Sequence, residues 1–196
     1  MKAYYEARAP EYDEWYLGLG RFDGLDRPRW NDELHALVRA LDALPAARTL
    51  DVACGTGFLT RHLRGELTGL DQSAAMLEVA ARRVPAADLV LADALPLPFA
   101  DRSFDRVFTG HFYGHLEDAE RRLFLQEARR VAQELVVVDS AIRPDRLREE
   151  RQERILNDGS RWDVYKRYFT PAELAAELGG ETIFAGRWFV AVRSHA

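Results

Sequence analysis

The stretch from Thr49 to Thr60, which reads TLDVACGTGFLT, constrains the fold of this chain more than any other segment. Residues 49–53 have the β-branched and apolar composition of a buried parallel strand. Gly55 and Gly57 follow directly, and glycines allow the backbone to turn sharply and to approach a ligand closely. We expect a helix after this turn, with its free N–H groups directed at whatever the turn holds. The segment therefore predicts a strand, a glycine turn and a helix that together form a ligand site.

Asp51 narrows the class of ligand that this turn would hold. Its carboxylate stands at the mouth of the turn, where it would repel a diphosphate or triphosphate and attract positive charge. Two rival patterns are incomplete, because a dinucleotide fingerprint needs a third glycine where Thr60 stands and a P-loop needs Gly-Lys-Ser/Thr. A tight turn that holds no ligand is the remaining alternative. The segment favours a nucleoside ligand that carries positive charge.

Strand and helix patterns alternate along the rest of the chain. Helical spacing of apolar residues marks 31–44, 74–84 and 116–131, and strand composition marks 67–70, 88–92, 104–109 and 134–139. This alternation predicts a parallel sheet with helices on both faces. Farther on, residues 170–178 form a helix pattern that opens with a capping box, and strands at 182–185 and 188–193 are joined by Gly186 and Arg187, which permits only antiparallel pairing. We therefore expect a doubly wound, mostly parallel sheet of seven strands that ends in an antiparallel hairpin.

The length of 196 residues suits one domain, and we assign residues 1–196 to it. Residues 1–44 are expected to form an N-terminal helical cap, and residues 45–196 the α/β core. The charged run from Pro144 to Arg154 predicts the solvated face of a helix, because Glu150 and Arg154 stand at a favourable four-residue spacing.

Composition excludes several classes of protein. The formal net charge of -5 provides no general basic field, so a long nucleic acid is not expected as a partner. Cys54 is the only cysteine, which rules out an internal disulfide and disfavours a structural zinc site or a catalytic thiol. The sequence has neither an apolar run of about 20 residues nor a signal-peptide core, so we expect a cytoplasmic protein without a membrane span. Lys2 and Lys166 are the only lysines among 27 basic residues, a bias that we attribute to genome composition.

The pattern Asp-x-Ala-Cys-Gly-x-Gly at 51–57 resembles the glycine loop of class I S-adenosylmethionine-dependent methyltransferases, which usually reads acidic-x-Gly-x-Gly-x-Gly. Ala53 stands where the family more often has its first glycine. Residues 67–77 resemble the family's second motif, 91–99 its third motif, and 103–108 its fourth strand, so the resemblance extends from about Thr49 to Leu116. It implies a Rossmann-like α/β fold and S-adenosyl-L-methionine as the cofactor.

Three acidic residues fall at successive strand ends, where a doubly wound sheet binds its ligand. Asp71 could accept both hydroxyls of a ribose, Asp93 could accept the adenine amino group, and Asp51 could approach the ammonium group of the methionine portion. We expect Asp71 on the rim of the sheet, and any one of the three could instead cap the next helix. Together with the resemblance, this implies cofactor contacts by Asp51, Ala53, Cys54, Gly55, Thr56, Gly57, Asp71, Gln72, Met76, Asp93, Ala94, Leu95 and Gly110.

Methyl transfer from a sulfonium creates little new charge, so catalysis can rest on holding the reacting atoms in line. A general base is needed only when the acceptor must lose a proton that solvent cannot take. His111 and His115, directly after the fourth strand, are the candidates for that role, with plain structural histidines as the alternative. Their spacing could also serve a metal ion, but no third ligand is evident, so no metal is expected.

Aromatic residues crowd the first sixteen positions, with Tyr12 the third candidate for a catalytic role. The run from Tyr5 to Asp13 resembles the N-terminal cap of many small-molecule methyltransferases, which folds over the cofactor and forms part of the acceptor wall. Aromatic faces suit a sulfonium cation, although packing of a helix on the core would explain them too. Residues 158–162 and 165–168 are the candidates for the opposite wall.

These patterns predict a methyltransferase that acts on a small-molecule acceptor. An NAD(P)-dependent oxidoreductase is the first alternative, and it would require the third glycine and a Tyr-x-x-x-Lys pair near the nicotinamide. A non-catalytic S-adenosylmethionine-binding partner protein is the second, and it would keep Asp71 and Asp93 but have no enclosed acceptor pocket. The sequence predicts neither the acceptor atom nor the oligomeric state.

Overall fold

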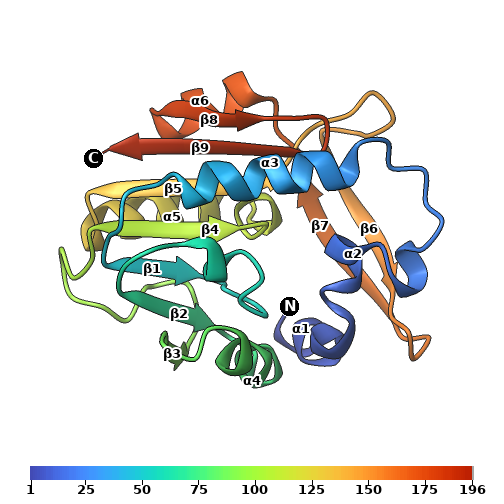
Figure 1. Cartoon of the computed structure of the whole chain (residues 1–196), viewed down its shortest axis with the longest axis horizontal. Coiled ribbons are helices and arrows are strands. Elements are labelled where there is room, and N and C mark those ends of the chain that lie inside the picture. Colours follow the sequence, from blue (N-terminus) through green and yellow to red (C-terminus); the bar gives the residue numbers. More distant parts are fainter. Residues whose placement is uncertain (196) are drawn as a thin grey trace.

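The computed structural model describes residues 1–195, and its centre is a seven-stranded sheet in the order β3-β2-β1-β4-β5-β9-β8 (Figure 1). Five strands run parallel to one another, whereas β9 is antiparallel to both of its neighbours. The strands are β1 (Thr49–Val52), β2 (Leu67–Asp71), β3 (Asp88–Leu91), β4 (Arg106–Gly110), β5 (Glu134–Ser140), β8 (Glu181–Ala185) and β9 (Phe189–His195). The predicted mostly parallel, seven-stranded sheet with an antiparallel hairpin is confirmed.

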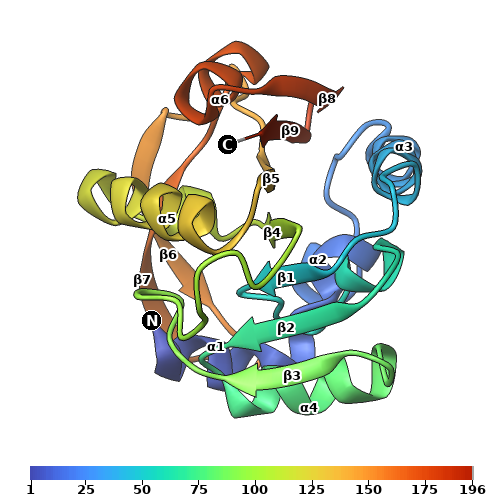
Figure 2. The ribbon, with the colours of Figure 1, turned by 90° about the vertical axis from the view of Figure 1, so that its left-hand side faces the viewer.

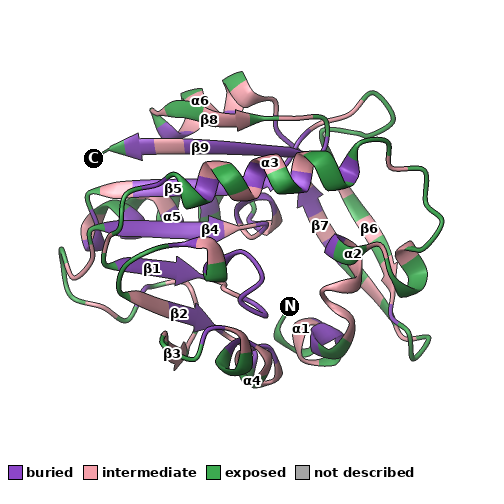
Figure 3. Ribbon diagram, in the orientation of Figure 1, coloured by how far each residue is buried: buried purple, intermediate pink, exposed green. Residues whose placement is uncertain are grey.

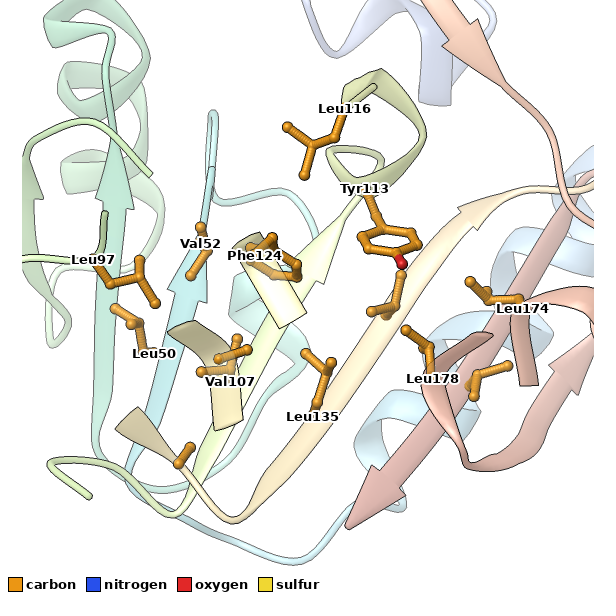
Figure 4. Close-up of a cluster of buried hydrophobic side chains, with 14 of the residues drawn as sticks. Leu50, Val52, Leu97, Val107, Tyr113, Leu116, Phe124, Leu135, Leu174 and Leu178 are labelled. Carbon is orange, nitrogen blue, oxygen red and sulfur yellow. The ribbon is translucent and has the colours of Figure 1, made fainter. Parts of the chain in front are cut away.

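Helices cover both faces of this sheet (Figure 2). The helix α3 (Trp30–Asp42) lies on one face, and α5 (Asp118–Val131) and α6 (Pro171–Leu178) lie on the other. Side chains along β5 alternate between the two layers, so that Leu135 packs with α5 and α6 while Val136 packs with α3. Figure 3 shows the central strands buried, and Figure 4 shows the layer beneath α5 and α6. The central strands are therefore buried on both faces, as their apolar runs predict.

Helix ends follow the predicted local signals. Ser73 precedes α4 (Ala74–Arg83), and its hydroxyl accepts a hydrogen bond from the Met76 N–H at 3.1 Å. Thr170 and Glu173 form the reciprocal capping box of α6, with proline at its first position. These caps fix where α4 and α6 start relative to the strands before them.

The helix expected after the glycine turn does not form. Residues after Gly57 make only one 3₁₀ turn, η3 (Thr60–His62), and Leu63 is already extended. Two features explain this: β2 begins at Leu67, and Gly65 (φ 107°) turns the chain against Ala47, whose carbonyl oxygen would lie 2.2 Å from a Cβ at position 65. The prediction of a helix at this point is wrong because too few residues separate the turn from the next strand.

The charged segment 144–154 is not a helix either. Its residues from 149 onward belong to β6 (Glu149–Ile155), which pairs antiparallel with β7 (Arg161–Arg167) in a separate two-stranded sheet. Opposite charges meet between the two strands, as in the pairs Arg161–Glu153 at 2.7 Å and Arg151–Asp163 at 3.3 Å. These cross-strand pairs replace the helical pair that the spacing of Glu150 and Arg154 predicts. The two strands and their turn are called the β6–β7 hairpin below.

The N-terminal segment lies beside α4 and the β6–β7 hairpin, over the carboxyl ends of the parallel strands (Figure 1). It contains α1 (Lys2–Arg8), η1 (Ala9–Glu11), α2 (Glu14–Leu17) and η2 (Gly20–Phe22), which together form the predicted helical cap. The carboxylate of Glu6 accepts the Ala74 and Ala75 N–H groups at 2.8 and 3.2 Å, so the cap is attached to the start of α4. The helix α3 belongs to the sheet layer instead. Among residues 1–195, no helix has the length and apolar character needed to cross a bilayer.

Candidate functional site

A cavity of about 520 Å³ opens at the carboxyl ends of β1, β2 and β4. The floor comes from the strand ends, one wall from the N-terminal cap, and another from the β6–β7 hairpin. The predicted site residues that line it are Tyr12, Ala53, Gly55, Asp71, Gln72, Met76, Asp93, Ala94, Leu95, Gly110, His111 and His115. The fold therefore brings together the residues selected from four separate strand ends.

The glycine loop has a left-handed backbone at every second residue. Ala53, Gly55 and Gly57 have φ angles of 58°, 55° and 72°. Ala53 thus adopts a conformation that a glycine would adopt without strain, which explains why the family pattern has glycine at this position. Gly57 does not line the cavity, because a Cβ there would lie 3.3 Å from the Val84 side chain. Its role is to let the loop pack against the end of α4.

Asp71 holds this loop in place. Its Oδ2 atom accepts the Gly55 N–H at 2.9 Å, and its Oδ1 atom accepts the Ser73 N–H at 2.9 Å. Burial raises the pKa of Asp71, and these backbone hydrogen bonds act in the opposite direction. The residue is only 6% exposed, so it does not lie on an open rim as expected. A carboxylate has about four acceptor sites, which leaves capacity for a ligand in the cavity.

Asp51 lies deeper, beside a second and much smaller cavity that shares Tyr12, Ala53 and Gly110 with the first. Its Oδ2 atom accepts the Thr60 hydroxyl at 2.6 Å, whereas Oδ1 is buried with no partner among residues 1–195. Burial raises the pKa of Asp51 to about 8. A cationic group that entered from the cavity would stabilise the ionised form of this carboxyl and give its unpartnered oxygen a partner.

Cys54 and Thr56 line only the smaller cavity. Burial raises the pKa of the Cys54 thiol, so the thiol stays protonated and is not a nucleophile. The Thr56 hydroxyl donates to Asp13 Oδ1 at 2.6 Å, and the other oxygen of Asp13 pairs with Arg83. Asp13 therefore ties the N-terminal cap to the glycine loop.

His111 is buried between aromatic rings, with Trp15 at 4.9 Å and Phe189 at 5.8 Å between ring centroids. Its Nδ1 atom lies 4.0 Å from Asp139 Oδ1, and Nε2 is buried without a partner among residues 1–195. Burial lowers the pKa of His111 to about 3. The imidazole is therefore neutral near pH 7, suited to hydrogen bonding and weak as a proton acceptor.

His115 closes the short 3₁₀ helix η4 (Tyr113–His115), so the two histidines do not share an α-helical face. Its Nδ1 atom lies 2.7 Å from the Tyr165 carbonyl oxygen, a bond that requires the proton on Nδ1. Burial lowers the pKa of His115, and Tyr5 packs edge-on against its ring. His115 thus connects β4 to the β6–β7 hairpin.

Asp139 and Lys166 form a buried ion pair that the sequence analysis did not select. The second oxygen of Asp139 accepts the Gly114 N–H at 2.7 Å, which orders the segment that carries both histidines. Two signals could have revealed the pair. Asp139 lies near the carboxyl end of its strand, as Asp51 and Asp71 do in theirs, and Lys166 is one of only two lysines among 27 basic residues.

Comparisons with known proteins agree with this geometry. A family model described as "Methyltransferase domain" matches residues 50–135. The demethylmenaquinone methyltransferase of Thermotoga maritima is 38% identical over 113 residues, which cover 55% of this chain and 47% of the relative. A 2-phytyl-1,4-naphtoquinone methyltransferase of Trichormus variabilis is 32% identical over 145 residues, covering 67% and 59%. The chain spans about half the length of the curated relatives it matches.

A solved structure described as the DhpI–SAH complex covers more of the chain. It superposes with a TM-score of 0.74 at 26% sequence identity, over 97% of this chain and 92% of that one. The likeness therefore includes the N-terminal cap, the sheet and the β6–β7 hairpin together.

Proposed function

We propose that this chain, a class I S-adenosylmethionine-dependent methyltransferase, transfers a methyl group from S-adenosylmethionine to a small-molecule acceptor. The observation that carries the proposal is the pair of carboxylates around the glycine loop. Asp71 lines the large cavity, and its carboxylate can accept further hydrogen bonds. Asp51 lines the small cavity, and one of its oxygens has no hydrogen-bond partner among residues 1–195. A ribose and an ammonium group, both present in this cofactor, suit these two positions.

The residues present fit the cofactor along its whole length. Asp71 would hold the ribose hydroxyls, Asp93 and the two residues after it would hold the adenine, and Asp51 would face the ammonium group. When bound, S-adenosylmethionine supplies an electrophilic methyl group on a positively charged sulfur. Gly110 and Ala53 line both cavities and leave the backbone close to the ligand.

The chain's own contribution to catalysis would be alignment of the acceptor and exclusion of water. The cap and the β6–β7 hairpin both line the cavity, and His111, neutral because its pKa is about 3, can hydrogen-bond an acceptor group. At that pKa, His111 is too weak a base to take a proton from an acceptor near pH 7. The proposal therefore favours an acceptor whose proton leaves to solvent or is already lost.

Mass spectrometry of the purified protein, with retained S-adenosylmethionine or S-adenosylhomocysteine as the expected finding, is the first test. Calorimetric titration follows, in which S-adenosylhomocysteine should bind more tightly than NADH. Tighter binding of NADH would reject the methyltransferase in favour of the oxidoreductase. Binding of S-adenosylhomocysteine without transfer to any of a broad panel of small acceptors would favour the non-catalytic partner protein.

We propose in addition that the N-terminal cap acts as a lid over the cofactor. Changing Tyr12 to Phe keeps the ring that faces Gly55 and removes the hydroxyl. The turnover of Tyr12→Phe should fall while its melting temperature stays unchanged. A turnover equal to that of the wild type would mean that the acceptor does not react beside Tyr12. A cytoplasmic location stays a prediction, which cell fractionation would test.

A further inference from the structure

Arg8 is a buried cation without an anion. Three arginines are buried within residues 1–195, and two of them are paired: Arg106 with Glu134, and Arg121 with Glu177. Arg8 is 6% exposed, has no carboxylate within 4.0 Å among the described residues, and leaves its Nε atom without a partner. Its one side-chain hydrogen bond goes to the Tyr4 hydroxyl. A guanidinium cannot lose its proton, so burying it unpaired is costly and calls for an anion that the chain does not supply.

Arg154 is a second cation in the same region. It is half-buried on β6, and its guanidinium donates to the Gln152 side-chain oxygen at 3.0 Å but contacts no carboxylate of residues 1–195. Its register partner Trp162 packs against Tyr4, with ring centroids 5.8 Å apart, and Tyr4 is the residue that Arg8 contacts. Both arginines therefore lie near the aromatic pair formed by Tyr4 and Trp162.

Two tyrosines connect these cations to the large cavity. Tyr5 and Tyr12 both line it, and the Arg8 guanidinium lies 5.2 Å from the Tyr12 ring centroid. Burial raises the pKa of both phenols, and the charges of Arg8 and Arg154 act against that rise. Neither hydroxyl has a hydrogen-bond partner within the described part of the chain, so both are free to donate to a ligand.

Carboxylates line other parts of the large cavity, among them Asp93, Glu117 and Glu120, whereas the charges of Arg8 and Arg154 act on Tyr5 and Tyr12. Asp139 is the buried carboxylate beside His111, and Lys166 neutralises it. Other nearby carboxylates are engaged: Glu150 faces Arg146, and Asp163 faces Arg151. The charge of Asp71 also acts on Tyr12, but Asp71 is one of the residues proposed to bind the cofactor. Arg8 and Arg154 are left without a carboxylate partner among residues 1–195.

We propose that the acceptor carries an oxyanion, a carboxylate or a phosphate-type group, which Arg8 and Arg154 bind together with the hydroxyls of Tyr5 and Tyr12. This rests on the proposed function, because it names the class of acceptor for the same cavity. Charge-assisted hydrogen bonds from arginine suit both kinds of anion. The cofactor's own carboxylate has the same chemistry and is the rival source. Neither arginine lines the cavity itself, but Arg154 belongs to the β6–β7 hairpin and not to the strand ends that carry the proposed cofactor contacts, which favours the acceptor.

The test uses Arg8→Gln and Arg154→Gln, with Arg161→Gln as the matched control. Arg161 lies on the same two-stranded sheet, is 64% exposed and already pairs with Glu153. S-adenosylhomocysteine and 5′-methylthioadenosine, which lacks the carboxylate, are titrated calorimetrically into each protein. Inorganic phosphate and acetate are then titrated into the S-adenosylhomocysteine-saturated protein while its melting temperature is followed.

Phosphate or acetate should stabilise the wild-type complex and the Arg161→Gln complex. Arg8→Gln and Arg154→Gln should each weaken the apparent affinity for phosphate or acetate about tenfold or more, while the affinity for S-adenosylhomocysteine stays unchanged. Arg154→Lys, which keeps the charge, should retain most of the effect and separates loss of charge from misfolding. No anion effect on the wild type, or an equal effect in all variants, would overturn the proposal.

A loss of affinity for S-adenosylhomocysteine, but not for 5′-methylthioadenosine, in Arg154→Gln would also overturn it. The anion would then belong to the cofactor. Failure of the proposed function has a different signature. If the proposed function is wrong, the wild type should bind neither nucleoside. Stabilisation of the unliganded protein by phosphate, lost in Arg154→Gln, would still show that the anion site exists.

Discussion

Replacement of Asp71 by alanine is predicted to destabilise the fold as well as the ligand site. The carboxylate connects the glycine loop to the start of α4 through the N–H groups of Gly55 and Ser73, both at 2.9 Å. Alanine would leave both donors without their acceptor in a region where Asp71 is only 6% exposed. The loss therefore reaches beyond the cavity into the packing of the loop.

The magnitude follows from those two bonds. Hydrogen bonds to a charged group contribute about 1.5–3 kcal/mol each to stability. Water that entered the space left by the side chain would restore part of that free energy. We expect Asp71→Ala to lower the free energy of unfolding by about 3 kcal/mol, which for a chain of this length lowers the melting temperature by about 6–12 °C. Asp71→Asn keeps one acceptor oxygen and should lose roughly half as much.

Urea denaturation and scanning calorimetry measure the stability of each variant, and titration with S-adenosylhomocysteine measures its affinity. Asp93→Ala is the matched control, because Asp93 lines the same cavity but is exposed. It should weaken S-adenosylhomocysteine binding and leave the melting temperature within about 1 °C of wild type. If Asp71→Ala unfolds at the wild-type temperature, the carboxylate does not hold the loop, and the reasoning from these hydrogen bonds is refuted.

Three further predictions concern the same site. The pKa of Asp51, raised by burial from 3.8 to about 8, means that the folded chain keeps a proton that the unfolded chain loses between those values. The free energy of unfolding should thus fall as pH rises through that window, and urea titrations of Asp51→Asn should lose this slope. The pKa of His111, lowered by burial from 6.5 to about 3, has the opposite effect: stability should fall as pH drops below 6.5, less steeply in His111→Gln. Ala53→Gly, which relieves a left-handed φ of 58°, should raise the free energy of unfolding by about 0.5–1 kcal/mol in urea, and a decrease would contradict the strain.

The seven-stranded sheet could be predicted because its information is local. Each parallel strand is a short apolar run between turn or cap residues, and Ser73 and Thr170 mark the helices that follow. The β6–β7 hairpin could not be predicted, because its strands have the sequences EERQERI and RWDVYKR, in which apolar and polar residues hardly alternate. Its register depends on cross-strand ion pairs and on contact with Tyr4, which lies more than a hundred residues away.

The candidate site shows the same division. Acidic residues at strand ends were visible because their place follows from the parallel sheet. The burial of Asp71 could not be predicted from the sequence, because it depends on the glycine loop folding back over the strand end. Asp139 and Lys166 meet only when β5 and β7 come together, and no spacing in the sequence encodes that contact. Residues that act through distant partners are therefore the ones that sequence reasoning missed.

The β6–β7 hairpin leaves and rejoins the core at a single point. Ala141 and Phe169 form a parallel bridge there, and Ile142 N–H donates to the Phe169 carbonyl at 2.9 Å. Residues 142–168 therefore form a ribbon with adjacent ends, which one splice could exchange for another of different sequence. Because the loops proposed to hold the nucleoside lie outside the ribbon, the hairpin part of the proposed acceptor wall can be varied without changing them, provided that Lys166 is kept for its buried pair with Asp139. Grafting a relative's ribbon onto this sheet is thus a direct route to altered selectivity.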